Sequence, residues 1–358
     1  MRVCFFGAFD PAYPRNRILR TGLVAAGVEV VEARVPEHRA FRRYPALAAA
    51  FARVAAGTDV VMVPEFRHKD VPLARLLAGR RRLVFDPLVS RFDTLVGDWG
   101  VHAPRSAQAR WNRGLDRWAL ALADVVVCDT WAQGALYVEL GARRERLRRI
   151  LVGAEEIFFG LPSAPEEGEV RVLYVGGFLP LHGVLVLIEA TARLERQRAS
   201  LPPFRLTLVG RGIQFEQARR RVAELGLACV DFLGGRPYDE LPETLASAHV
   251  VVGAFGTTEK ARRVIPHKVF QGLAGARAVV TGDGPGVREV FEAGVHLDLV
   301  PVGDPEALSA TLAALLRDPG RRRELGRRGR ERAMEVGTPR QLGRELREVL
   351  EGRGASAA

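Results

Sequence analysis

The sequence predicts an α/β protein built from two doubly wound parallel-sheet domains. The length of 358 residues suits two domains better than one. Short runs rich in Val, Leu and Phe alternate with helix-length amphipathic stretches along nearly the whole chain. This alternation is typical of buried parallel strands joined by right-handed helical crossovers. A segment rich in proline, glycine and glutamate, residues 160–169, interrupts the alternation near the middle and is typical of a linker.

Six strands are expected in each half. They are residues 2–7, 28–35, 59–64, 82–87, 124–129 and 147–153, and then residues 170–177, 204–212, 228–235, 249–256, 276–284 and 295–301. We predict an amino-terminal domain over residues 1–160 and a carboxy-terminal domain over residues 161–336. A terminal helix within residues 337–358 is expected to pack back on the amino-terminal domain and to end in a frayed tail. Ligands of such sheets bind beyond the carboxyl ends of the strands, so two facing sheets would enclose an interdomain cleft.

The composition is that of an ordinary globular protein, with 47% apolar and 27% charged residues, which argues against disorder. A net charge of +11 favours anionic partners such as nucleotide phosphates or anionic lipid. Nucleic acid is not expected, because the arginines are spread over many helices and no zinc-ligand spacing occurs. Cys4, Cys128 and Cys229 lie in apolar runs and are expected to be reduced. With neither a leader nor a membrane-spanning run in the sequence, a cytoplasmic location is expected.

Two strand ends in the second half offer groups that suit an anion. Gly176 and Gly177 close one strand just before a helix that begins near Gly183. Glycines let a backbone approach a phosphate, and a helix start supplies free N–H groups with a partial positive charge. The next strand ends in a similar way, with Arg211 and Gly212 at the same edge. The alternative explanation is a pair of tight strand-to-helix turns, which need glycine in any case.

A third helix start is more unusual. Pro266 is expected to fix the first turn of a helix that carries Lys268. Lys268, Gln271, Gly272 and Gly275 then share one helical face by their spacing. An alternative is a close helix–helix contact through the two glycines. Three anion-binding strand ends in one domain favour a diphosphate ligand.

The region from about residue 170 to 350 resembles the donor-binding half of retaining glycosyltransferases of family 4, which have the GT-B fold. Five blocks carry the resemblance in matching order: RVLYVGGFLPLHGVLVLIEA, LTLVGRG, DFLGGRPYDELPETLASAHVVV, IPHKVFQGLAGARAVVTGDGPGVREVF and DPGRRRELGRRGRERAME. The PLHG turn and the Pro-x-Lys helix start indicate a variant of that family. In the first half, ADVVVCDTWAQGALYVELG followed by RILVGAEEIFF more loosely resembles the end of the acceptor domain.

The resemblance implies a nucleoside-diphosphate sugar as co-substrate, with no separate cofactor. It implies that Gly176 and Gly177 lie beside the donor diphosphate and that Gly234 to Pro237, including Arg236, hold the nucleotide base through the main chain. Lys268 would meet the phosphates and Gln271 would face the ribose.

The sequence departs from the family's pattern at several of these positions. Phe178 and His182 stand where the family commonly has an arginine and a lysine, and Arg263 and Gln271 stand where it often has two glutamates. Arg211 and Lys268 are expected to supply the missing charge. His182 and His267 are placed so that either could donate a hydrogen bond to a phosphate oxygen.

The acceptor side is less defined in the sequence. The loop after the first strand carries Asp10, Arg15, Asn16 and Arg17. Arginines at a helix start have the wrong sign for the helix dipole, which favours a phosphate or carboxylate partner for them.

A second acceptor-side segment follows the fourth strand and carries Asp86 and Ser90. Asp86, directly at the strand end, is the carboxylate that we place nearest the reacting sugar. A helix N-cap is an equally good explanation for it.

No Asp-x-Asp pair, HExxH motif or Cys/His ligand cluster occurs in the sequence, so no metal is expected. The leaving diphosphate would then be stabilised by helix starts and cations, with Lys268, Arg211 and Asp86 as the catalytic candidates. The resulting hypothesis is a glycosyltransferase that moves a sugar from a nucleoside-diphosphate sugar to an acceptor hydroxyl with retention.

Two alternatives remain open at this point. One is a non-catalytic sugar-nucleotide-binding homologue, and the other is a sugar-nucleotide 2-epimerase on the same fold. The acceptor could be a glycan, a lipid-linked sugar or a small molecule. The arginine-rich exterior could also bring the protein into peripheral contact with an anionic membrane, or it could simply be solvated.

Overall fold

The computed structural model describes residues 1–36, 40–164 and 168–353, and its contacts divide the chain into two compact units. Unit 1 comprises Met1–Gly153 together with the chain from Thr338 onward, and unit 2 comprises Ala154–Gly337. The chain therefore passes from one unit to the other at residues 153/154 and again at 337/338. Part of the predicted linker, residues 165–167, and most of the predicted frayed tail, residues 354–358, lie outside the described residues.

Unit 1 contains a six-stranded sheet in the order β2-β1-β3-β4-β5-β6, and each neighbouring pair is parallel. The strands are β1 (Arg2–Gly7), β2 (Glu29–Arg34), β3 (Val60–Val63), β4 (Arg82–Phe85), β5 (Val125–Cys128) and β6 (Leu147–Arg149). Every residue of β3 and β5 is buried, which explains why these strands are uninterrupted apolar runs without alternation.

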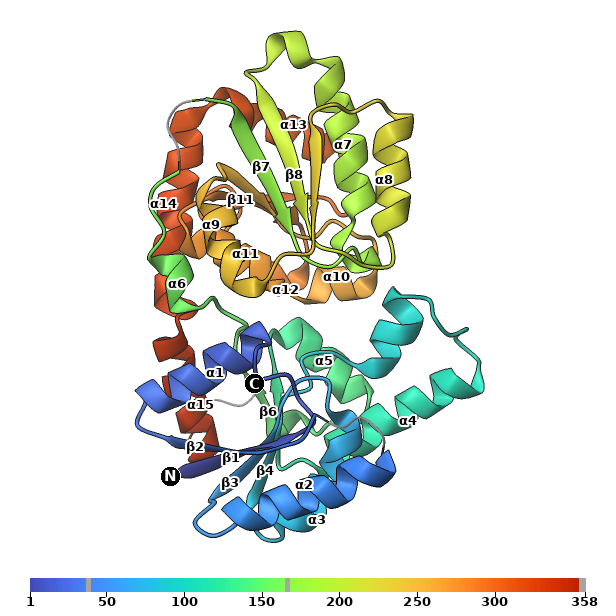
Figure 1. The fold of residues 1–358 in the computed structure, drawn as a ribbon, viewed down its shortest axis with the longest axis vertical. Helices are drawn as coiled ribbons and strands as arrows, with labels where there is room; N and C mark the ends of the chain where they lie inside the picture. Colours follow the sequence, from blue (N-terminus) through green and yellow to red (C-terminus); the bar gives the residue numbers. More distant parts are fainter. Residues whose placement is uncertain (37–39, 165–167, 354–358) are drawn as a thin grey trace. The chain divides into compact units, whose positions relative to one another are not determined.

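Helices lie on both faces of this sheet (Figure 1). The α-helices of unit 1 are α1 (Pro14–Ala25), α2 (Ala40–Val54), α3 (Val71–Ala78), α4 (Ala107–Leu122), α5 (Trp131–Glu139) and α15 (Pro339–Leu350), with short turns η1 (His68–Asp70), η2 (Asp93–Asp98) and η3 (Arg144–Arg146). Ser106, Thr130 and Thr338 cap α4, α5 and α15, each accepting a hydrogen bond from the backbone N–H three residues later.

The terminal helix α15 belongs to unit 1 and packs against α1. The two helices cross where Gly22 faces Gly343, because a Cβ on Gly22 would lie 2.1 Å from the Pro339 carbonyl oxygen and 2.9 Å from the Gly343 nitrogen. Only glycine allows the two backbones to approach this closely.

Unit 2 contains a second six-stranded parallel sheet, in the order β12-β11-β10-β7-β8-β9. Its strands are β7 (Val170–Val175), β8 (Phe204–Val209), β9 (Val230–Gly234), β10 (Val250–Val252), β11 (Ala278–Gly282) and β12 (Asp298–Val300). All twelve strands fall inside the ranges expected from the sequence, so the predicted fold class of two doubly wound parallel sheets is confirmed.

Helices again lie on both faces of the sheet (Figure 1). They are α6 (Glu156–Phe159), α7 (Val184–Arg196), α8 (Phe215–Glu224), α9 (Leu241–Ala246), α10 (Glu259–Arg263), α11 (His267–Ala274), α12 (Pro285–Arg288), α13 (Pro305–Arg317) and α14 (Pro319–Val336), with turns η4 (Pro180–His182), η5 (Arg198–Ser200) and η6 (Tyr238–Glu240).

The strand order locates a switch point in each sheet, where the chain reverses the direction in which it adds strands. In unit 1 the switch point lies between β1 and β3, and in unit 2 it lies between β7 and β10. Ligands of open α/β sheets bind beyond the carboxyl ends of the strands at such points. The segments that follow β1 and β3 in unit 1, and β7 and β10 in unit 2, are therefore the places to look for a site.

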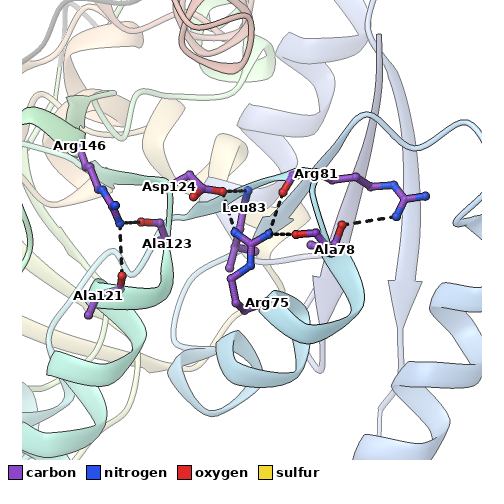
Figure 2. Close-up of polar contacts among 9 residues, drawn as sticks. Arg75, Ala78, Arg81, Leu83, Ala121, Ala123, Asp124 and Arg146 are labelled. Carbon is purple, nitrogen blue, oxygen red and sulfur yellow. Dashed lines mark hydrogen bonds and ion pairs between the residues drawn. The ribbon is translucent and has the colours of Figure 1, made fainter.

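The opposite, amino-terminal edge of the first sheet is occupied by structural contacts (Figure 2). Asp124 accepts a hydrogen bond from the Leu83 nitrogen at 2.8 Å and pairs with Arg75 at 2.8 Å. Arg146 donates to the carbonyl oxygens of Ala121 and Ala123, at the end of α4, at 3.3 and 2.8 Å. These groups satisfy one another and tie β4, β5, α3 and α4 together.

Two further expectations from composition concern cysteine and membrane spans. Cys4, Cys128 and Cys229 are buried and form no disulfide, as expected. Among the residues that the structure describes, no helix combines the length and the apolar character needed to cross a bilayer.

Candidate functional site

The turn after β7 is held by two side chains that contact the same carbonyl group. The Tyr174 hydroxyl donates to the Gly177 oxygen at 2.5 Å, and the Nδ1 atom of His182 also contacts this oxygen. Both rings lie beside one another, with centroids 6.2 Å apart. The paired glycines are therefore fixed in place by an aromatic residue from the strand and a histidine from η4.

His182 differs from its predicted role. Its pKa is lowered well below the usual value by burial of the ring and by the proximity of Lys268, so the ring is neutral near pH 7. Because the neutral ring uses its Nδ1–H on the Gly177 carbonyl, its other nitrogen is an acceptor and cannot donate to a phosphate oxygen. In this geometry His182 positions the turn.

Lys268 is a buried lysine beside the turn that follows β7. It lies in the first turn of α11, which begins after Pro266, and the residue is only 5% exposed. Its Nζ atom lies 3.9 Å from the centroid of the Tyr174 ring and close to Gly176, where an added Cβ would be 3.3 Å away. Within the described residues this Nζ has no hydrogen-bond partner.

An unpartnered buried ammonium group is costly. Burial lowers the pKa of Lys268 well below its usual value, because moving a charge out of water disfavours the charged form. Native structures rarely leave such groups without a partner unless a ligand supplies one. Gly176 and Lys268 come from the two sides of the switch point between β7 and β10, so this ammonium group lies where a ligand is expected.

The turns after β7, β8 and β9 are joined through their backbones. The Gly176 nitrogen donates to Val209, and the Gly210 nitrogen donates to Gly234 at 2.7 Å. A Cβ on Gly210 would lie 1.9 Å from the Gly176 oxygen, so this position requires glycine for packing alone. A Cβ on Gly212 would likewise lie 2.6 Å from the Phe178 nitrogen.

Arg211 is exposed at the end of this row of turns. Its guanidinium lies over the Phe215 ring at 5.4 Å and beside Gly234, where an added Cβ would be 3.5 Å from Nη2. The structure thus brings two predicted residues, Arg211 and Gly234, together. Arg236 instead forms an exposed ion pair with Glu240 at 3.2 Å, and Pro237 is an exposed residue preceding η6.

The predicted face of α11 separates into polar and packing positions. Gln271 is 5% exposed and donates to the Tyr238 hydroxyl at 2.9 Å, while His267 is half-buried at the start of the helix. Gly272 packs against β10 and β11, since a Cβ there would lie 2.9 Å from both Val251 and Val279. The sequence allowed a close helix–helix contact through Gly272 and Gly275 as an alternative. At Gly272 a close contact does exist, but it joins helix α11 to strands β10 and β11.

Tyr174 and Tyr238 were not singled out from the sequence. Tyr174 stands two residues before Gly176 and therefore points to the same side of the strand, which is a usable signal. Tyr238 offers no comparable signal, because its contact with Gln271 spans 33 residues.

In unit 1, the predicted acceptor residues Arg15 and Asp86 form a buried ion pair. The Arg15 Nε lies 2.6 Å from the Asp86 carboxylate, and both side chains are 0% exposed. Arg15 also donates to the carbonyl oxygens of Leu151 and Ile150, each at 3.1 Å. The cation at the helix start thus finds its carboxylate within the unit, and Asp86 neither caps a helix nor reaches solvent.

Two further carboxylic acids lie near this pair and were missed. Glu65 follows β3 and Asp129 follows β5, and both are buried. Burial and the Asp86 charge raise the pKa of Glu65 to about 8. Burial also raises the pKa of Asp129 to about 7, although Arg15 opposes this change. Asp86 thus has two carboxyl neighbours at the carboxyl edge of the sheet, and their raised pKa values favour the protonated forms near neutral pH.

The remaining acceptor-side candidates have local structural contacts. The Ser90 hydroxyl donates to Asp116 at 2.6 Å, and Asn16 donates to the Asp10 carbonyl oxygen at 2.7 Å. Asp10 is exposed, and its carboxylate accepts from the Ala12 nitrogen, while Arg17 is half-buried. Within the described part of the chain, no group of three or more His, Cys, Asp or Glu side chains is arranged to hold a metal ion.

The chain is similar to known proteins in both structure and sequence. Over 98% of its length the chain superposes on a whole solved protein, Anabaena Alr3699/HepE in complex with UDP and glucose, with a TM-score of 0.73 and 17% identity. The chain has the GT-B fold. The part of this GT-B chain that matches the family "Glycosyl transferases group 1" is residues 161–332, which lie within unit 2 and contain Lys268, Gly176 and Arg211.

Curated relatives of the GT-B chain are glycosyltransferases by name. A GDP-mannose-dependent alpha-(1-6)-phosphatidylinositol monomannoside mannosyltransferase from Mycolicibacterium smegmatis is 30% identical over 185 residues, which is 51% of this chain and 48% of that protein. An MMP alpha-(1->4)-mannosyltransferase from Mycolicibacterium hassiacum is 28% identical over 312 residues, or 76% of this chain and 72% of that protein. The chain thus spans about half the length of the first of these two relatives.

Proposed function

We propose that this protein is a glycosyltransferase that transfers a sugar from a nucleoside-diphosphate sugar to an acceptor hydroxyl. The observation that carries the proposal is the buried, unpartnered ammonium group of Lys268 next to Gly176 at the switch point of unit 2. The names of the relatives and the group 1 match over the same residues support it.

The chemistry of the leaving group explains the arrangement. When the bond between the anomeric carbon and the diphosphate breaks, negative charge develops on the diphosphate oxygens. Lys268 and the N-terminal turn of α11 would stabilise that charge from one side, and Arg211 would do so from the turn after β8. Both cations belong to unit 2 and could supply the positive charge that a metal ion would otherwise provide. We therefore propose transfer without a metal ion.

The fixed turn after β7 has a defined role in this proposal. Tyr174 and His182 hold the Gly177 carbonyl, so the backbone of this glycine, including its N–H, is already oriented before the donor arrives. Preorganised donors stabilise developing charge without reorganising during the reaction. We further propose retention of anomeric configuration, with a diphosphate oxygen accepting the proton of the acceptor hydroxyl.

The names of the similar proteins suggest which nucleotide sugars and which acceptors to test first. The structural neighbour is described in complex with UDP and glucose, and one relative is named as GDP-mannose-dependent. UDP and GDP sugars are therefore the first donors to test. The acceptor of that relative is a phosphatidylinositol derivative by name, so lipid-linked acceptors come before free sugars.

A non-catalytic binding protein is the second candidate, and one observation favours it. Gln271 takes the place of the glutamate that would face the ribose, and its amide is engaged by Tyr238. An amide accepts hydrogen bonds only through its oxygen, whereas a carboxylate accepts from both hydroxyls of a diol.

The deciding experiment separates binding from turnover. Thermal shift with UDP, GDP, TDP and their sugars reports binding, because a ligand of the folded state raises the melting temperature. Release of the nucleoside diphosphate from the preferred sugar, with and without EDTA, reports turnover. Binding with no release over any acceptor tested would favour the second candidate. Release that EDTA abolishes would refute the metal-independent mechanism, and no shift with any nucleotide would refute both candidates.

A further inference from the structure

Helix α4 of unit 1 exposes two tryptophans on one face. Trp111 is 64% exposed and Trp118 is 54% exposed. They are seven residues apart, which at about 100° per residue places the two side chains within about 20° of each other around the helix. Single exposed apolar residues are common on protein surfaces, but adjacent exposed indoles in one helix are not.

The rest of the exposed face has an ordered arrangement. Beside the tryptophans, the helical positions that follow around the circumference are Ala107, Gly114 and Ala121, and beyond them are Arg110, Arg113 and Arg117. All six residues are exposed, and Ala107, Gly114 and Ala121 carry at most a methyl group. The face therefore runs from indoles through small residues to guanidinium groups.

The charge of this face is purely positive. The one acidic residue of α4, Asp116, is 0% exposed on the opposite side of the helix. It accepts hydrogen bonds from the Ser90 hydroxyl at 2.6 Å and from the backbone nitrogens of Arg91 and Phe92 at 3.0 and 2.9 Å. No carboxylate of α4 is thus available to neutralise the three arginines.

The segment before α4 extends the same surface character. Trp99 is 36% exposed and Val101 is 56% exposed, and Arg105 is also exposed. The Arg105 carbonyl oxygen accepts a hydrogen bond from Arg110 at 2.9 Å, which ties the segment to the helix. Two connected segments thus combine exposed apolar side chains with arginine.

The helix is firmly held, so its exposed indoles are not the result of a frayed end. Ser106 caps its first turn, accepting from the Ala109 nitrogen at 3.1 Å. Arg146 binds the Ala121 and Ala123 carbonyl oxygens at its other end (Figure 2). The buried side packs against α3 and η1. A rigid helix presents its outer face as a fixed surface.

We propose that this face of α4 rests on the surface of an anionic lipid bilayer. Indole rings favour the boundary between headgroups and acyl chains, where their apolar body and their N–H are both satisfied. Arginine side chains at the same level attract anionic headgroups. Apolar insertion combined with charge gives more stable attachment than either contribution alone.

The test is sedimentation of the full-length protein with vesicles of phosphatidylcholine alone and of phosphatidylcholine with phosphatidylglycerol. We expect the protein to pellet with the phosphatidylglycerol vesicles at low salt and to show a shift of tryptophan emission to shorter wavelength. The double variant Trp111→Ser/Trp118→Ser and the triple variant Arg110→Gln/Arg113→Gln/Arg117→Gln should each reduce the bound fraction by about tenfold.

A matched control is Leu76→Ser on α3. Leu76 is 76% exposed in the same unit but has no exposed indole partner on its helix, so this variant should bind as the wild type does. Melting temperatures of all variants should agree, since only exposed side chains are changed. Failure of the wild type to pellet with phosphatidylglycerol vesicles would overturn the proposal, as would pelleting that neither α4 variant weakens.

A second copy of this chain is the competing occupant, because Ala107, Gly114 and Ala121 would let another helix approach. Sedimentation velocity without lipid distinguishes the two. A dimer that dissociates in the Trp111→Ser/Trp118→Ser variant would overturn the membrane proposal, whereas a monomer at all concentrations agrees with it.

Discussion

The ammonium group of Lys268 lies over the face of the Tyr174 ring, 3.9 Å from its centroid, while the hydroxyl of the same ring holds the Gly177 carbonyl. The aromatic face partly compensates the buried cation, and the hydroxyl orders the turn that contains the candidate phosphate-binding backbone. One side chain therefore connects the charge and the geometry of the proposed diphosphate site.

Substitution of Lys268 is expected to separate stability from function. Lys268→Met should abolish the thermal shift produced by the preferred nucleoside diphosphate, because the cation is lost. It should also raise the melting temperature of the unliganded protein by about 2–6 °C, since an apolar chain of similar length removes the cost of burying an unpartnered amino group. Differential scanning calorimetry with and without nucleotide measures both effects.

The control for this variant is Lys69→Met, which removes an exposed lysine from unit 1. It should leave the nucleotide-induced shift unchanged. A Lys268→Met protein that still shows the full shift would place the diphosphate elsewhere.

At a pH above the pKa of Lys268 in the free protein, nucleoside diphosphate binding is expected to take up a proton. Burial holds the pKa of Lys268 well below its usual value in the free protein, and a bound diphosphate would raise it again. The affinity for the nucleoside diphosphate should therefore fall as pH rises above the pKa that Lys268 has in the unliganded protein. Titration calorimetry in two buffers with different ionisation enthalpies gives the number of protons taken up. In Lys268→Arg, where the cation is charged throughout, this uptake should disappear; equal heats in both buffers for the wild type would contradict the assignment.

Asp86 is expected to act as a structural residue. Removing one partner of a buried ion pair leaves the other charge uncompensated and costs about 3–5 kcal/mol, so Asp86→Ala should destabilise unit 1 by about that amount in urea unfolding. The double variant Arg15→Met/Asp86→Leu should recover much of the loss, because no charge is then left buried. An Asp86→Asn variant that keeps its stability but loses turnover would instead support the catalytic role predicted from the sequence.

The stability of unit 1 is expected to decrease as pH rises through the neutral range. Burial raises the pKa of Glu65 from 4.5 to about 8, so between these values the folded chain holds a proton that the unfolded chain has released. Stability is then highest at the acid end of this window and falls toward its alkaline end. Asp129, with its pKa raised to about 7, contributes in the same direction.

Glu65→Gln tests this linkage. The variant should melt a few degrees higher than the wild type at about pH 9 and close to it at about pH 5, because its amide cannot ionise. Glu139→Gln, which removes an exposed carboxylate from the same unit, should follow the wild-type profile. Identical pH profiles for Glu65→Gln and the wild type would show that Glu65 is ionised in the folded protein.

The fold could be predicted because its strands are continuous apolar runs. Val125–Cys128 and Val250–Val252 are buried on every side, so their sequences contain no polar residue to obscure the pattern. The site in unit 2 was partly predictable for a similar reason, since proline before Lys268 and glycine at positions 176 and 177 are local signals. The contact between Lys268 and Tyr174 was not, because it joins a helix residue and a strand residue that are far apart in the sequence.

The polar cluster of unit 1 shows the limit of such predictions. Arg15 and Asp86 are 71 residues apart in the sequence, so the carboxylate partner expected for Arg15 could not be identified as Asp86 from local patterns. Glu65 and Asp129 resemble ordinary polar residues after a strand. They become neighbours of Asp86 only because β3, β4 and β5 are adjacent in the sheet, which is a property of the strand order and not of any local pattern.

The crossing of α15 over α1 has a consequence for how the protein is made. Helix α15 leaves the ribosome only after all of unit 2 has been synthesised, so the surface of α1 around Gly22 stays uncovered until then. Nascent chains released before residue 338 would contain every strand of both sheets yet present an apolar helix face to chaperones. Completion of the amino-terminal unit is thus delayed until α15 has been synthesised, after every strand of both sheets.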